Sequence, residues 1–145
     1  LKLSSTKSIV KNKSIILIDD SLVRGTTCHK IVKMLYESGA KEVHVRIACP
    51  EIKFPDYYGV DMPTKEELLA NEKTLKEMCD HINAKTLKFL SLNGLYKALT
   101  GSNRNSSYPQ FSDHYFTGEY PIKPSDKLKG LKVKQLSLLS GKSNN

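Results

Sequence analysis

The sequence predicts an α/β fold with a parallel sheet, and two features indicate it. The first is the apolar run Ser14-Ile-Ile-Leu-Ile18, which is typical of a strand buried on both faces of a parallel sheet. The second is a strand pattern over 42–48, separated from the first by apolar residues at helical spacing, Ile31 and Leu35, and by a glycine stop at Gly39. Strand, helix and strand in this order form a βαβ unit, whose two strands are parallel.

For the rest of the chain, the sequence predicts short helices and a strand, followed by a helical C-terminal extension. A proline-rich loop covers residues 49–63, and a basic tail with little fixed structure covers 122–145, which leaves 1–121 as the folded part. Between them we expect a helix opened by the capping-box spacing of Thr64 and Glu67, a helix over 74–82, a strand over 86–90, a helix capped by Ser91 and an ordered patch at 115–121.

Charge and hydropathy exclude several classes of protein. The net charge of +8 comes from the two ends, because the middle of the chain, residues 15–121, is close to neutral. Solvated lysine-rich ends explain this distribution better than a nucleic-acid interface, which concentrates charge and aromatic side chains on a folded face. No apolar run is long enough to cross a membrane, and the first residues do not form a signal peptide. We therefore expect no nucleic-acid partner and no membrane partner.

The cysteines and histidines do not form a metal site. The three cysteines, Cys28, Cys49 and Cys79, are far apart and odd in number, which argues against a disulfide scaffold or a four-cysteine zinc site and favours a reducing, cytoplasmic location. Cys28 would follow the start of a helix, which lowers a thiol pKa, but we expect it to be a packing residue. The four histidines lack metal-ligand spacing.

Chemistry is concentrated in the stretch that follows the first strand, Asp19-Asp-Ser-Leu-Val-Arg-Gly-Thr-Thr27. Ligands of open α/β sheets bind at the carboxyl ends of the strands, and a helix start offers free N–H groups to an anion. Gly25 permits close approach of the backbone to a phosphate, while Thr26 and Thr27 add hydroxyl donors. As plain helix N-caps, however, the threonines would be structurally sufficient.

The two carboxylates in this stretch, Asp19 and Asp20, are unfavourable beside a phosphate unless something offsets their charge. A divalent cation and the hydroxyls of a sugar can both do so. A ligand with a phosphate, a ribose diol and a magnesium-bound diphosphate fits all these features, and 5-phosphoribosyl 1-diphosphate (PRPP) is such a ligand. The alternative is a capped turn after a strand.

This motif resembles the PRPP-binding motif of the type I phosphoribosyltransferases, and its form is similar to that of the amidophosphoribosyltransferases. Further stretches are similar in the same order, among them Phe54-Pro-Asp-Tyr-Tyr-Gly59 and Phe116-Thr-Gly-Glu-Tyr-Pro121. The resemblance covers residues 1–121 and identifies them as the C-terminal part of a phosphoribosyltransferase domain. It implies the parallel-sheet part of the type I fold.

The resemblance also implies an activity: PRPP and ammonia from glutamine give 5-phosphoribosylamine, the first committed step of de novo purine synthesis. Asp19 and Asp20 would bind Mg²⁺ and the ribose hydroxyls, and the 5-phosphate loop would consist of Ser21, Arg24, Gly25, Thr26 and Thr27. No catalytic residue is assigned. The family is oligomeric, which favours a homo-oligomer for the full-length enzyme.

Several family features fall outside this sequence. The glutaminase domain, with its N-terminal cysteine nucleophile, and the diphosphate-binding loop precede the motif in the family, so we expect a fragment that is inactive alone. One branch of the family holds an iron–sulfur cluster. Its cysteine positions fall near Asp56, Ser112 and Tyr115 here, so we expect no cluster.

Alternatives remain open at this point. Arg24 contacts the phosphate or pairs with an acid on a neighbouring element. Tyr57, Tyr58 and Asp61 line the cleft or, as we favour, pack the proline-rich loop. The chain as a whole is a part of the enzyme, a non-catalytic PRPP-binding regulatory module, or a remnant that binds nothing.

Overall fold

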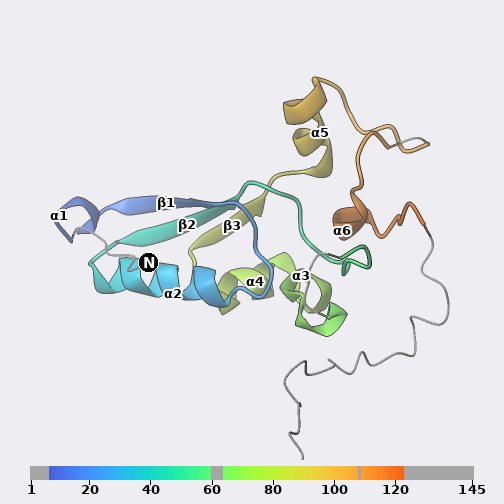
Figure 1. Ribbon diagram of the computed structural model, residues 1–145. Coiled ribbons are helices and arrows are strands. Elements are labelled where there is room, and N and C mark those ends of the chain that lie inside the picture. Colours follow the sequence, from blue (N-terminus) through green and yellow to red (C-terminus); the bar gives the residue numbers. More distant parts are fainter. Residues whose placement is uncertain (1–6, 60–63, 108, 123–145) are drawn as a thin grey trace, which may run out of the picture.

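The computed structural model describes residues 7–59, 64–107 and 109–122, and it shows three parallel strands with helices packed against one face (Figure 1). The predicted tail lies outside the described residues, apart from Ile122. In chain order the elements are α1 (Lys7–Val10), β1 (Ser14–Asp19), α2 (Thr26–Glu37), β2 (Glu42–Ile47), the 3₁₀ helix η1 (Lys65–Glu67), α3 (Leu69–Glu72), α4 (Leu75–His81), β3 (Thr86–Phe89), α5 (Leu92–Thr100) and α6 (His114–Thr117).

The predicted βαβ unit is confirmed. The sheet order is β1-β2-β3, and both pairs of strands are parallel. Because the strands are parallel, their carboxyl ends lie at one edge of the sheet, and the loops that follow β1, β2 and β3 meet there. This edge carries the predicted motif.

The core lies between the sheet and the helices α2 and α4. Val43, Val45 and Ile47 of β2 point to this side and are almost completely buried, whereas His44 and Arg46 point to the other side. On the helix side, Val32 of α2 and Met78 of α4 are buried against the strands. The alternation along β2 places one apolar row in the core, as expected for a strand with one covered face.

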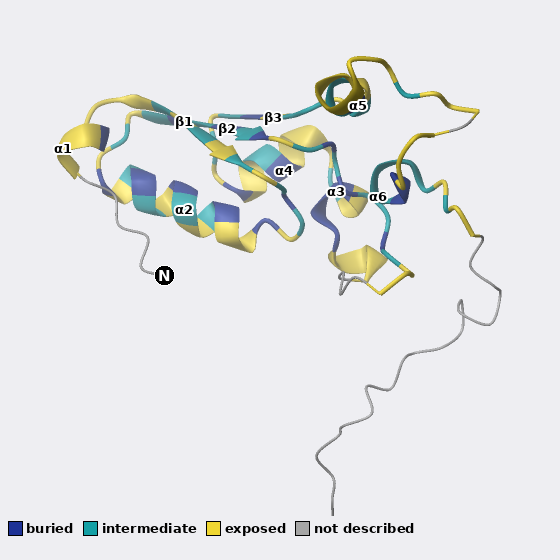
Figure 2. Cartoon of the chain, turned by 45° about the horizontal axis from the view of Figure 1, so that its top comes forward, coloured by how far each residue is buried: buried dark blue, intermediate teal, exposed yellow. Residues whose placement is uncertain are grey.

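The prediction that β1 is buried on both faces is wrong for the part of the chain that the structure describes. Ile16 and Ile18 are 65% and 73% exposed, whereas Ile15 and Leu17 pack against the core. Figure 2 shows exposed positions in yellow along β1. The physical reason is that β1 is an edge strand here and that the described helices cover only one face of the sheet. A continuous apolar run reports which surfaces a strand can bury, not which of them are covered.

Most of the later elements begin where the sequence predicts. Thr74 caps α4 through a hydrogen bond from the Glu77 N–H (3.3 Å), and Ser91 caps α5 through one from the Gly94 N–H (3.0 Å). The helix expected after Thr64 is different: it forms one 3₁₀ turn, η1, and then α3, because Leu68 is extended between them. Within the described residues, no helix has both the length and the apolar composition of a membrane span.

Candidate functional site: the loop after the first strand

The predicted motif forms a hollow at the carboxyl end of β1. All ten residues from Asp19 to Cys28 line it, and its volume is about 310 Å³. Its lining includes the carboxylates of Asp19, the last residue of β1, and of Asp20 after it, together with the first turn of α2. The structure therefore brings all seven predicted binding residues to one place.

The turn into α2 depends on Gly25. Its φ is 77°, in the left-handed region that glycine adopts without strain, and it is the N-cap of the helix. The suggestion that Thr26 or Thr27 is the N-cap is therefore wrong: both lie inside the first turn and are exposed. The first intrahelical hydrogen bond runs from the His29 N–H to the Gly25 carbonyl (2.8 Å), so the preceding N–H groups have no helical acceptor.

Within the part of the chain that the structure describes, the two carboxylates make only local hydrogen bonds. Asp19 Oδ1 accepts the Asp20 N–H (3.0 Å), and Asp20 Oδ1 accepts the Ser21 hydroxyl (3.3 Å). Asp20 is exposed and Asp19 half-buried, and among the described residues neither forms an ion pair with a lysine or arginine. Oxygen donors with spare lone pairs fit Mg²⁺, which commonly takes one or two carboxylates and completes its shell with water and substrate phosphate.

Arg24 pairs with an acid on a neighbouring element, which was one of the two alternatives. Its Nη2 lies 3.1 Å from Glu67 Oε1 in η1, and both side chains are about half exposed. Arg24 also lines the hollow, so the ion pair and a role beside the phosphate are compatible.

The loop is packed tightly from behind by α3 and α4. A Cβ added at Gly25 would lie 2.9 Å from Leu69 Cδ2 and 3.1 Å from His81 Cδ2. The backbone joins the same elements, because the Leu69 N–H donates to the Val23 carbonyl (2.9 Å). Glycine is required here both by its φ and by the lack of space.

The thiols near the site are not activated. Burial, followed by the charge of Asp19, raises the pKa of Cys28 to about 11, so the expectation that the helix start lowers it is wrong. Burial and then Asp20 raise the pKa of Cys49 to about 11 as well. Cys28 is buried, which confirms it as a packing residue.

The tyrosines of the proline-rich loop pack against the C-terminal segment. The Tyr58 hydroxyl donates to the Ile122 carbonyl (2.7 Å), and the rings of Tyr57 and Tyr120 lie 5.1 Å apart. The structural alternative is therefore confirmed for these two residues, while Asp61 lies outside the described residues.

The three positions discussed for an iron–sulfur cluster come together around a histidine. His114 Nε2 lies 2.8 Å from Asp56 Oδ1, and His114 Nδ1 lies 2.9 Å from Ser112 Oγ. The side chains of His114 and Asp56 are buried, and Tyr115 stacks on the His114 ring with centroids 4.0 Å apart. Oxygen and imidazole donors that bond to one another do not match the thiolate set that such clusters use.

A second buried polar group lies next to the first. Asp113 accepts hydrogen bonds from Arg104 and from the Tyr96 hydroxyl, and Arg104 also pairs with Glu119. Burial raises the pKa of Asp113, but the hydrogen bonds from Arg104 and Tyr96 outweigh it, and the pKa ends below its usual range. These contacts hold the patch at 115–121, which the sequence predicts as ordered.

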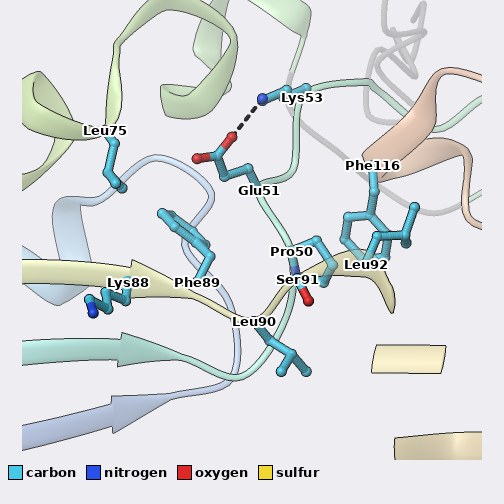
Figure 3. Close-up of a pocket in the computed structure, with 10 residues that line it drawn as sticks. All are labelled: Pro50, Glu51, Lys53, Leu75, Lys88, Phe89, Leu90, Ser91, Leu92 and Phe116. Atoms are coloured by element: carbon cyan, nitrogen blue, oxygen red, sulfur yellow. Dashed lines mark ion pairs between the residues drawn. The ribbon is translucent and has the colours of Figure 1, made fainter. Parts of the chain in front are cut away.

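A larger hollow, of about 400 Å³, lies at the carboxyl ends of β2 and β3. Figure 3 shows Phe89 beneath Leu75 on one side of it and Phe116 beside Leu92 on the other. Of its two lysines, Lys53 is paired with Glu51 at 2.6 Å, and Lys88 has no ion pair among the described residues. Six of its ten lining residues are apolar, and it lacks the pair of carboxylates that lines the first hollow.

The sequence-based prediction missed two contributors to the site. Glu67 was identified only as half of a capping box, and Leu69 only as an apolar helix residue, although both contact the loop. Each of these two contacts joins residues that are more than forty positions apart in the sequence. A single sequence carries no signal for such contacts.

Comparisons with known proteins agree on one family. An amidophosphoribosyltransferase from Rhizobium etli is 49% identical over 141 residues, covering 97% of this chain and 28% of the relative. One from Staphylococcus aureus (strain Mu50) is 49% identical over 121 residues, covering 83% and 24%. The Rhizobium match extends into the lysine-rich tail, beyond residue 121, where the predicted resemblance ends. No family model matches the chain.

Solved structures show the same relationship. A glutamine PRPP amidotransferase from B. subtilis, complexed with ADP and GMP, superposes with a TM-score of 0.77 at 42% identity, over 87% of this chain and 28% of that one. A structure described as the allosteric regulatory enzyme of purine biosynthesis superposes with a TM-score of 0.73 at 42% identity. The chain spans about a quarter of the length of the relatives it matches.

Proposed function

We propose that this chain, which is homologous to one part of the amidophosphoribosyltransferases, supplies the ribose 5-phosphate half of a PRPP-binding site. The observation that carries the proposal is the hollow at the end of β1, which is lined by two carboxylates and by a helix start. A ligand that joins a phosphate to a sugar diol matches both kinds of group at once.

The phosphate would lie against the first turn of α2. The N–H groups there have no helical acceptor, and the positive end of the helix dipole favours an anion. The hydroxyls of Thr26 and Thr27 add donors around the same anion, and that of Ser21 would join them by turning away from Asp20. The close turn at Gly25 lets the backbone approach the anion.

The carboxylates of Asp19 and Asp20 would accept hydrogen bonds from the ribose hydroxyls and hold Mg²⁺. When bound, this ion would neutralise the charge that develops on a leaving diphosphate. The carboxylates can take both roles because their oxygens are engaged only by local donors.

For the whole protein we propose amidophosphoribosyltransferase activity: ammonia derived from glutamine displaces diphosphate from PRPP and gives 5-phosphoribosylamine, in purine biosynthesis. The chain spans 28% of the Rhizobium relative, so the glutaminase and the groups that bind the diphosphate would lie on other parts of the protein. We propose a cytoplasmic homo-oligomer and expect no turnover by these 145 residues alone.

A titration tests the proposal. Isotope-labelled chain is titrated with ribose 5-phosphate, and with ribose and inorganic phosphate as controls, while the amide resonances are followed. We expect saturable shifts centred on Gly25, Thr26 and Thr27 for ribose 5-phosphate, weaker ones for phosphate and none for ribose. A chain that shows no saturable shift with ribose 5-phosphate would contradict the proposal and favour the remnant.

A further inference from the structure

Arg24 is held by one end of its guanidinium. Its Nη2 lies 3.1 Å from Glu67 Oε1, and the side chain also lines the hollow. A guanidinium carries five N–H donors in a planar fork, so this contact leaves the other donors for a second acceptor. The ion pair therefore orients Arg24 without occupying it.

Glu67 is itself fixed. Its second oxygen, Oε2, accepts the Thr64 N–H at 3.1 Å, and the Glu67 N–H donates to the Thr64 carbonyl at 2.9 Å. The carboxylate is thus shared between the backbone of η1 and the side chain of Arg24.

The element that carries Glu67 is joined to the phosphate loop independently of this ion pair. The Leu69 N–H donates to the Val23 carbonyl at 2.9 Å, and the Leu69 side chain packs on Gly25. The backbone of η1 and α3 therefore keeps a fixed position relative to the loop, and Glu67 can hold Arg24 at a fixed place on its rim.

We propose that Glu67 is a positioning residue for the phosphate site: it keeps the Arg24 guanidinium at the rim of the hollow, where its remaining donors meet the ligand phosphate. This inference rests on the proposed function. Outer residues of this kind act by fixing the orientation of a side chain that touches the ligand.

The sign of the change in phosphate affinity distinguishes a positioning role of Glu67 from a purely electrostatic one. A carboxylate near an anion repels it, so removal of the Glu67 charge would tighten phosphate binding if charge were its only influence. If Glu67 positions Arg24, removal of the Glu67 charge weakens phosphate binding. The Arg24 side chain is then free before the ligand binds, and it loses conformational entropy when it contacts the phosphate.

The test compares Glu67→Gln with Glu72→Gln in the full 145-residue chain, with ribose 5-phosphate as the probe. Glu72 lies in the neighbouring helix α3, is exposed, and has no ion pair among the described residues, so it is a matched control for charge. We expect the dissociation constant to rise about threefold to fivefold for Glu67→Gln and to stay within about twofold for Glu72→Gln.

A double-mutant cycle supplies a readout that a merely structural role would not move. In an Arg24→Gln background, Glu67→Gln should change the dissociation constant no further. Unchanged or tighter binding by Glu67→Gln, or an equal loss in both backgrounds, overturns the inference while leaving the proposed function intact. Failure of the unaltered chain to bind ribose 5-phosphate overturns both.

Discussion

Two pairs of aspartates in this chain show opposite uses of the same side chain. Asp56 and Asp113 are buried, and their carboxylates bond to His114 in one case and to Arg104 and Tyr96 in the other. Asp19 and Asp20 lie at an open edge of the sheet, and only neighbouring donors contact them. The first pair holds segments of the chain together, and the second keeps oxygen lone pairs that can accept hydrogen bonds from a ligand or bind a metal ion.

The surroundings of a carboxylate distinguish a structural role from a binding role. A buried carboxylate needs a partner within the protein, since an unpaired charge there is costly. A carboxylate that lies at the carboxyl end of a strand, keeps spare acceptors and lines a hollow together with a helix start has the features of a ligand site. The comparison predicts that the buried pair controls stability and that the open pair controls binding.

The largest expected effect is that of Asp113→Asn, which removes the charge partner of the buried Arg104. Breaking a buried pair costs about 3–5 kcal/mol, and we expect a loss of unfolding free energy near the lower figure, because Glu119 still pairs with Arg104. Urea unfolding followed by tyrosine fluorescence measures it. Asp20→Asn is the control, with an expected change below about 0.5 kcal/mol. Similar losses for both variants would contradict the comparison.

The second largest loss of stability is expected for Gly25→Ala, because the added Cβ is strained by the left-handed backbone and contacts Leu69. Gly101 has nearly the same φ, 76°, but nothing within 4 Å of an added Cβ, so Gly101→Ala is the matched control. The left-handed backbone costs about 1 kcal/mol in both, and the contact with Leu69 adds about 1–2 kcal/mol at Gly25 alone. Only Gly25→Ala should also abolish the shifts caused by ribose 5-phosphate. Binding that survives Gly25→Ala would show that the tight turn is not needed.

Acid should weaken the buried pair. The folded-state pKa of Asp113 lies below its usual value, so the stability it contributes is complete above about pH 4 and is lost as the pH falls through the folded-state pKa. The free energy of unfolding, measured from neutral pH down to about pH 3, should therefore fall less steeply in Asp113→Asn than in the unaltered chain. Equal slopes in the two proteins would mean that Asp113 does not carry this dependence.

The sequence predicts most of the elements and the position of the motif in the fold. The apolar run that ends at Asp19 predicts β1, the capping residues Thr74 and Ser91 predict the starts of α4 and α5, and the motif places the loop at the carboxyl edge. These features follow from local patterns, namely periodicity, caps and a strand followed by a helix.

The remaining features depend on contacts between distant residues. No local pattern shows that Glu67 reaches Arg24, or that His114 lies between Asp56 and Ser112. The exposure of Ile16 and Ile18 was missed for a related reason, because the burial of a strand face depends on which layers cover it. The pKa of the Cys28 thiol is raised, whereas the sequence predicts that it is lowered, because the effect of burial outweighs that of the helix start.

The roles of Asp19 and Asp20 are tested by the magnesium dependence of PRPP binding, measured by calorimetry on the unaltered chain and on Asp19→Asn/Asp20→Asn. We expect weak binding that strengthens with Mg²⁺ in the unaltered chain. In the double variant we expect loss of that dependence, with ribose 5-phosphate binding partly kept and the unfolding free energy changed by less than about 1 kcal/mol. Equal affinity with and without Mg²⁺ in the unaltered chain would contradict the roles assigned to Asp19 and Asp20.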